Sequence, residues 1–133
     1  MERILIVDDV DLNRKILKYL FKSIYNNVII DEAENGIIAL QMMKNENYDL
    51  TFLDIHMPKM NGDEVVKKFR EFENKNSKDR SNIIALSGSL EENNDYDKNF
   101  LHMVTDYMIK PITKDKILKA VKMCGYSKSV RFE

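Results

Sequence analysis

The sequence predicts an α/β fold in which five helices cover both faces of a doubly wound, five-stranded parallel sheet. Short apolar segments rich in Ile, Leu and Val alternate five times with longer segments whose apolar residues recur at helical spacing. The short segments are almost continuously apolar, which is typical of parallel strands that are buried on both faces. Because parallel strands need crossover connections, the longer segments are expected to be the connecting helices. For a doubly wound sheet of five strands we expect the order 2-1-3-4-5.

The predicted strands share an enrichment in residues that favour extended backbone. In chain order they are RILIV (3–7), VIIDEAE (28–34), DLTFL (49–53), NIIAL (82–86) and TDYMI (105–109).

The predicted helices each carry apolar residues three or four positions apart. From the first to the fifth, these residues are Leu12, Ile16, Leu20 and Ile24; Ile37, Leu40 and Met43, within residues 36–45; Val65, Phe69 and Phe72; Tyr96, Phe100 and Met103; and Ile117, Val121 and Cys124. The fourth helix begins among acidic residues, Glu91, Glu92, Asp95 and Asp97, which suit a helix N-terminus or a partner surface.

The chain is large enough for one well-filled domain, since it has 133 residues of which 44% are hydrophobic. We expect this domain to span residues 1–125, because Gly125 suits the end of a helix. Residues 126–133 would then form a tail or the start of a linker. The segment ENKNSKDRS (73–81) is too polar to pack and is predicted to be a solvated loop.

Charge and cysteine content exclude several classes of protein. A net charge of −1 argues against general binding to nucleic acid or to anionic membranes. No apolar run reaches the roughly 18 residues of a membrane span. Cys124 is the only cysteine, so neither an intramolecular disulfide nor a cysteine metal cluster can form. We expect a reducing, cytoplasmic location.

Five polar residues stand at the ends of predicted strands: Asp8, Asp9, Asp54, Ser87 and Lys110. Carboxyl ends of parallel strands meet at one edge of the sheet, where open α/β folds build their sites. In the expected strand order the first and third strands are neighbours. The three aspartates should therefore share one crevice, with Ser87 and Lys110 on its rim.

An acidic crevice of this kind indicates a site for a cation. Two unit charges about 4 Å apart repel by roughly 4 kcal/mol at an effective dielectric constant near 20. Carboxylate ligands without thiolates suit a hard divalent ion, Mg²⁺ first and Mn²⁺ second. A carboxylate, such a cation, a lysine and a hydroxyl are together the parts of a phosphoryl-transfer site.

The motifs ILIVDD, DEAENGIIAL, DLTFLDIHMPKMNG, IIALSGS and DYMIKPI occur in this order over nearly the whole chain. With these motifs the chain resembles the CheY-like receiver domain of two-component response regulators. DDVDLNRKIL and IIALSGS are most similar to receivers of hybrid histidine kinases and phosphorelays. The resemblance implies a flavodoxin-like fold, and a phosphoryl group taken from a phosphohistidine of a sensor kinase or phosphotransfer protein.

The resemblance also implies individual roles in the site. Asp54 would be the phosphoacceptor. Asp8 and Asp9 would hold Mg²⁺ together with Asp54 and the backbone carbonyl of His56.

The remaining roles concern signalling and phosphate binding. Ser87 would take the place of the switch hydroxyl, and Tyr107 that of the rotating aromatic ring. Lys110 would bind the phosphoryl group, with a cis peptide bond before Pro111. The switch would alter the face formed by the fourth helix, fifth strand and fifth helix, where an output partner binds.

Two departures from the family pattern bear on this function. In HMVT (102–105), Met103 stands where glycine is common. The residues two positions beyond Asp54 and Ser87 are His56 and Ser89, neither of which orients an attacking water as a carboxylate or amide would. The resemblance therefore implies slow self-hydrolysis, over minutes, with His56 obstructing water unless its imidazole acts as a general base.

Three other functions fit parts of the sequence. An aspartyl phosphatase of the haloacid dehalogenase type needs a second aspartate two residues after the nucleophile, and His56 is there instead. A flavodoxin-like electron carrier needs a loop after the first strand that cradles phosphate, and DDVDLN would repel it. A degenerate receiver that only binds partners would not need the full set of reactive residues.

Overall fold

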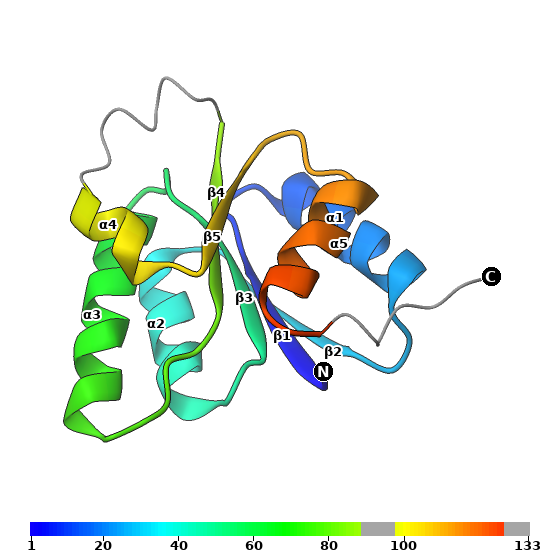
Figure 1. Cartoon of the computed structure of the whole chain (residues 1–133). Coiled ribbons are helices and arrows are strands. Elements are labelled where there is room, and N and C mark those ends of the chain that lie inside the picture. Colours follow the sequence, from blue (N-terminus) through cyan, green and yellow to red (C-terminus); the bar gives the residue numbers. More distant parts are fainter. Residues whose placement is uncertain (89–97, 127–133) are drawn as a thin grey trace.

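The computed structural model describes residues 1–88 and 98–126, which contain five strands and five helices. The strands are β1 (Arg3–Val7), β2 (Ile29–Ala33), β3 (Leu50–Asp54), β4 (Ile83–Ser87) and β5 (Asp106–Ile109). The helices are α1 (Asp11–Ile24), α2 (Gly36–Asn45), α3 (Gly62–Lys75), α4 (Lys98–Met103) and α5 (Lys114–Met123). All strands are parallel in the order β2-β1-β3-β4-β5, so the predicted fold is confirmed (Figure 1).

The sheet separates two apolar layers. Helices α2, α3 and α4 cover one face, and α1 and α5 cover the other (Figure 1). Successive side chains of a strand point to opposite faces, and β1 follows this rule. Leu5 and Val7 pack in the layer of α2 and α3, whereas Ile4 and Ile6 pack with α1 and α5. Burial on both faces explains why the strand segments read as continuous apolar runs.

Two helices begin where a side chain can satisfy a free backbone amide. The Asn35 side chain accepts a hydrogen bond from the Ile38 amide at 2.9 Å, at the start of α2. Thr113 does the same for the Lys116 amide, at 3.3 Å, at the start of α5. The polar residues that punctuate the sequence thus fix these helix starts.

The prediction for the first helix was right in its position and partly wrong in its face, since Ile24 is buried and Leu20 packs against the core but the other two predicted residues do not. Leu12 and Ile16 are 63% and 47% exposed, and the buried side chains are Leu17, Phe21 and Ile24. The reason is geometric. A spacing of four residues advances about 40° beyond a full turn, so a run of such steps winds around the helix instead of following one face.

The polar segment 73–81 is only partly the solvated loop that was predicted. Residues 74–80 are exposed, but α3 extends through Lys75 and Glu73 is buried. Glu73 is tolerated there because its carboxylate accepts hydrogen bonds from Arg70 Nη1 at 2.7 Å and from the Ser81 amide at 2.8 Å.

Of the segment predicted as the fourth helix, the structure describes α4, Lys98–Met103. Phe100 is buried against the layer of α2 and α3, as its predicted helical position requires, and Met103 packs against the same cluster. Arg70 Nε donates to the Met103 carbonyl at 2.8 Å, so the end of α4 is fixed to α3. Tyr96 and the acidic residues of segment 91–97 lie outside the described residues.

None of the helices in residues 1–88 and 98–126 has both the length and the apolar character that a membrane-crossing segment requires.

Candidate functional site

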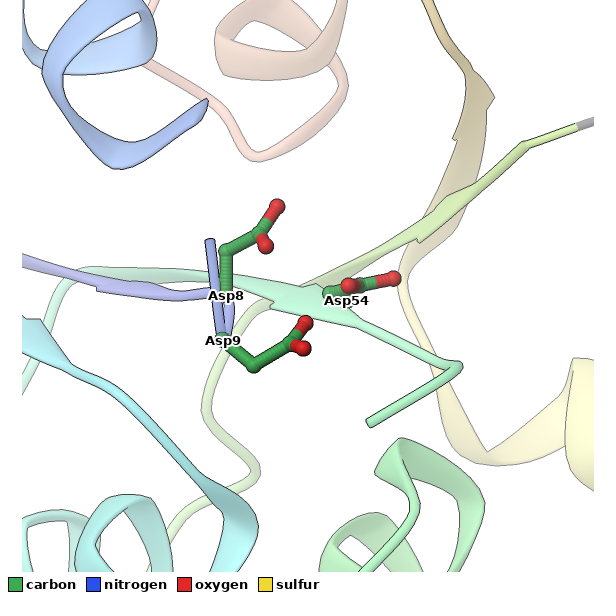
Figure 2. Close-up of side chains that lie close together, drawn as sticks. All are labelled: Asp8, Asp9 and Asp54. Carbon is green, nitrogen blue, oxygen red and sulfur yellow. The ribbon is translucent and has the colours of Figure 1, made fainter. Parts of the chain in front are cut away.

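The predicted acidic crevice is present at the carboxyl ends of β1 and β3. Carboxylate oxygens of Asp8, Asp9 and Asp54 all lie within 4.8 Å of one another. Figure 2 shows the three side chains reaching into the same space from the two neighbouring strands. Asp8 and Asp54 are only 2% and 5% exposed, whereas Asp9 is open to solvent. The strand order brings together residues that are 46 positions apart in sequence (54 − 8).

The sequence suggested that Asp54 follows the third strand, but Asp54 is the last residue of β3. Its backbone remains in the ladder, opposite Leu86 of β4, so the side chain has a fixed origin. The chain then leaves the sheet toward α3. The first residue of α3, Gly62, lies very close to the backbone of Asp54 and Ile55. A Cβ atom on Gly62 would lie 2.5 Å from the Asp54 carbonyl oxygen, so only glycine fits there.

The Asp54 carboxyl has weak partners for a buried charge. The His56 amide donates to Oδ1 at 3.3 Å, and Lys110 Nζ lies 3.5 Å from Oδ2. Burial raises the pKa of Asp54 from its usual 3.8 to about 6, with Lys110 opposing this shift and Asp8 adding to it. The ionised form of Asp54 is therefore held at a cost in free energy.

Asp8 is better supported than Asp54. Its Oδ1 accepts from the Val10 amide at 2.9 Å, and Lys110 Nζ lies 3.3 Å from its Oδ2. One lysine ammonium thus serves two buried carboxylates, and Asp9 adds a third negative charge nearby. An excess of carboxylate oxygens over cationic groups is the donor set that a hard divalent cation requires. The crevice fits such a cation.

Lys110 and Ser87 lie at the same edge of the sheet as the acidic crevice, as the sequence predicted, but Ser87 is not on the rim. Ser87 is the last residue of β4 and is fully buried, so it lies deeper than the predicted rim. Its carbonyl accepts from the Lys110 amide at 2.7 Å, which joins the ends of β4 and β5. The peptide bond between Lys110 and Pro111 is cis, as the resemblance implied.

Tyr107 and His56 are not gathered into the crevice. Tyr107 lies on the edge strand β5 with 40% of its surface exposed. His56 is exposed just beyond Asp54, and its backbone carbonyl stays a predicted metal ligand. Ser89, the other residue predicted to affect hydrolysis, lies outside the described residues.

Sequence reasoning missed an apolar groove beside the crevice. A cavity of about 370 Å³ extends from Asp8 and Lys110 between α1 and the segment that follows β5. Ile16, Leu17 and Ile112 supply much of its apolar lining. The signal was present in the sequence, since the first helix carries more apolar residues than one buried face needs.

The protein-family model of the response regulator receiver domain matches residues 4–122 of the sequence. The chain belongs to the response regulator receiver family. Hybrid signal transduction histidine kinase F of Dictyostelium discoideum is 34% identical over 122 residues, which are 91% of this receiver domain and 10% of that kinase. The chain spans less than half the length of the curated relatives it matches.

Two solved structures are similar to the receiver domain over its length. Response regulator TrrA of Thermotoga maritima, in complex with Mg(2+)-BeF, has a TM-score of 0.78 and 32% identity, covering 93% of this chain and 99% of that chain. The receiver domain of Ssk1 from Saccharomyces cerevisiae, co-crystallised with the histidine phosphotransfer protein Ypd1, has a TM-score of 0.83 and 27% identity. That comparison covers 96% of this chain and 91% of the other.

Proposed function

We propose that Asp54 of this receiver domain accepts a phosphoryl group from a phosphohistidine. The observation that carries the proposal is the place of the Asp54 carboxyl, which is buried within 4.8 Å of two further carboxylates and lies 3.5 Å from Lys110 Nζ. In the proposed step a carboxylate oxygen of Asp54 forms a bond to phosphorus. The bond from phosphorus to the imidazole nitrogen breaks, and the imidazole leaves with the electron pair and takes up a proton from water.

We propose Mg²⁺ as the cation of the crevice, with Mn²⁺ as an alternative. Asp8, Asp9 and Asp54, together with the backbone carbonyl of His56, would hold it. Oxygen ligands support this choice, because Mg²⁺ prefers one or two carboxylates with waters and phosphate oxygens. When bound, Mg²⁺ offsets the negative charge that spreads over the phosphoryl oxygens.

Lys110 and Ser87 would bind the phosphoryl group once it is on Asp54. Lys110 Nζ, which lies 3.5 Å from an Asp54 oxygen, is placed to donate to a phosphoryl oxygen. Ser87 lies at the end of the neighbouring strand β4. From there its hydroxyl would donate to a second phosphoryl oxygen.

The switch would follow from this contact. If Ser87 moves toward the phosphoryl group, the exposed Tyr107 ring can turn inward, and the face of α4, β5 and α5 changes shape. We propose this face as the site of an output partner.

A sensor histidine kinase or a histidine phosphotransfer protein is the proposed phosphodonor. The apolar groove supports this, because it begins at Asp8 and Lys110 and continues along the exposed Ile16 of α1. A helical partner could bury its apolar side chains there while presenting its phosphohistidine to Asp54. The solved complex of Ssk1 with Ypd1 supports a partner of this kind.

The proposal extends to the organisation of the chain. Residues 1–125 would form the receiver domain and residues 126–133 a tail or linker, in a stand-alone regulator or a longer hybrid kinase. Its net charge of −1 supports a domain that does not itself bind nucleic acid. A cytoplasmic location, where kinases have access to ATP, is part of the proposal.

The other functions considered from the sequence have less support. A haloacid dehalogenase-type phosphatase and a flavodoxin-like carrier both belong to families other than the one that matches residues 4–122. A degenerate receiver would not need Lys110 within reach of both Asp8 and Asp54, as it is here.

Incubation with Mg²⁺ and acetyl phosphate tests the proposal. Intact-mass spectrometry should find one added phosphoryl group that hydroxylamine removes, because it is an acyl phosphate. Asp54→Asn should abolish the addition, whereas Asp63→Asn, which changes an exposed carboxylate on α3, should leave it unchanged. Labelling that survives Asp54→Asn would refute the assignment of Asp54.

A further inference from the structure

Arg14, near the start of α1, holds together three segments that meet beside the acidic crevice. Its Nη1 donates to the Asp8 carbonyl at 2.7 Å, its Nη2 to Asp11 Oδ1 at 2.9 Å, and its Nε to Glu32 Oε1 at 3.2 Å. The side chain is only 12% exposed. A planar guanidinium with all three nitrogens bonded fixes its partners more rigidly than an ammonium on a flexible stem. Arg14 therefore holds the end of β1 against α1 and β2.

The carbonyl that Arg14 holds belongs to the peptide bond between Asp8 and Asp9. Because the peptide is planar, the orientation of this carbonyl sets the direction in which Asp9 leaves β1. The Asp8 carboxylate has hydrogen-bond partners of its own. In the part of the chain that the structure describes, no hydrogen bond or ion pair holds the Asp9 carboxylate. The backbone orientation is therefore what keeps Asp9 directed at Asp54.

We propose that Arg14 is a positioning residue for the divalent cation. It orients the Asp8–Asp9 peptide so that the Asp9 carboxylate joins those of Asp8 and Asp54. The inference rests on the proposed metal site, since it assumes that these carboxylates bind a cation. Arg14 acts through the backbone and does not touch the metal. Removing partners that orient metal ligands typically lowers affinity by about 10- to 100-fold.

Electrostatics alone predicts the opposite effect of an Arg14 substitution on metal affinity. Arg14 is a cation near a cation site, so its removal should tighten metal binding if only charge mattered. Lys15 provides a matched control on the same helix. It is exposed and pairs with Asp11 at 2.9 Å, so Lys15→Ala removes one positive charge and leaves the hydrogen bond to the Asp8 carbonyl intact.

Binding of Mn²⁺ to the full chain, measured by the loss of the free-ion signal in electron paramagnetic resonance, tests the proposal. Arg14→Ala should bind Mn²⁺ at least roughly tenfold more weakly than the parent. Arg14→Lys, which keeps the charge and one possible contact, should be intermediate. Lys15→Ala should bind as the parent does or slightly more tightly. Unchanged or tighter binding by Arg14→Ala would overturn the proposal.

Two further measurements keep the test decisive. Phosphorylation of Arg14→Ala by acetyl phosphate should recover at saturating Mg²⁺, because the loss is one of affinity, and labelling that stays low would contradict this. Urea unfolding establishes that each variant is folded. If Arg14→Ala does not fold, Arg14→Lys decides, and parental affinity in that variant overturns the proposal.

The failure of this inference can be told apart from the failure of the proposed function. A parent protein that binds no Mn²⁺ would overturn the metal site and the role of Arg14 together. A parent that binds Mn²⁺, loses it in Asp9→Ala and is unaffected by the Arg14 substitutions would overturn the role of Arg14 alone.

Discussion

Replacing Asp54 by Asn should stabilise the metal-free receiver domain at neutral pH. The ionised carboxylate of Asp54 is buried at the end of β3, close to the negative charges of Asp8 and Asp9. Asn has nearly the same shape and keeps an oxygen that can accept from the His56 amide, but it carries no charge. The substitution therefore removes the unfavourable charge while retaining most of the packing.

The expected gain can be worked from the pKa of Asp54, which burial raises from 3.8 to about 6. The pKa of Asp54 is thus about two higher in the folded than in the unfolded state. At about 1.4 kcal/mol for each unit of pKa, ionised Asp54 costs the folded state roughly 3 kcal/mol. This cost remains although Lys110 attracts the carboxylate and lowers its pKa. Because the new amide group needs an acceptor, we expect a gain of about 1–3 kcal/mol in the free energy of unfolding.

The sign of the pH dependence follows from the same shift. Asp54 has a higher pKa in the folded than in the unfolded state, so its cost is fully present above about pH 6. This cost disappears as Asp54 becomes protonated, between about pH 6 and the unfolded value of 3.8. The advantage of Asp54→Asn over the parent should therefore be largest at pH 7.5 and nearly absent at pH 4.

Urea unfolding followed by circular dichroism, in the presence of a chelator, measures this difference across the pH range. Asp79→Asn is the control, since it removes an exposed loop carboxylate and should change stability by less than about 0.5 kcal/mol. A parent that is more stable than Asp54→Asn at pH 7.5, or a difference that does not shrink on acidification, would refute the reasoning about a buried charge.

Three further predictions concern the metal, the lifetime of the phosphoryl group and the switch. Asp9→Ala should weaken Mg²⁺ binding in calorimetry yet stabilise the metal-free protein, and parental affinity would contradict the crevice model. His56→Ala should shorten the lifetime of the phosphoryl group on Asp54, because the exposed ring obstructs water; a longer lifetime would identify the imidazole as a general base. Ser87→Ala and Tyr107→Ala should still be phosphorylated but lose the change in amide exchange around α4 that beryllofluoride induces, and an unaltered response would exclude the proposed coupling.

The sequence alone was sufficient to predict the acidic crevice. Asp8, Asp54 and Lys110 each stand at the end of an apolar run, and parallel strands place their carboxyl ends at one edge of the sheet. The location of these residues depends on strand order and not on side-chain packing. The alternation of strands and helices is a strong local signal for a doubly wound parallel sheet, and 2-1-3-4-5 is one of the common strand orders of such sheets.

Features that depend on distant partners were not predictable in this way. The buried face of α1 is decided by which side chains meet Phe52 and Ile84 of the sheet, and a run of four-residue steps from Leu12 winds around the helix and does not mark that face. Glu73 likewise reads as a solvated loop residue until Arg70 and Ser81 are seen to pair with it. Both cases show tertiary contacts overriding local polarity and periodicity.

Lys110 would couple the proposed metal binding to phosphorylation, because its ammonium lies 3.3 Å from Asp8 and 3.5 Å from Asp54. In the unphosphorylated domain this single charge is divided between two buried carboxylates. A phosphoryl group on Asp54 would carry more negative charge and more acceptor oxygens, and it would compete more strongly for the ammonium. Asp8 would then lose part of its counter-charge and would gain more from a divalent cation. Since coupling between two sites is reciprocal, phosphorylation should tighten metal binding by the same factor by which the metal favours phosphorylation.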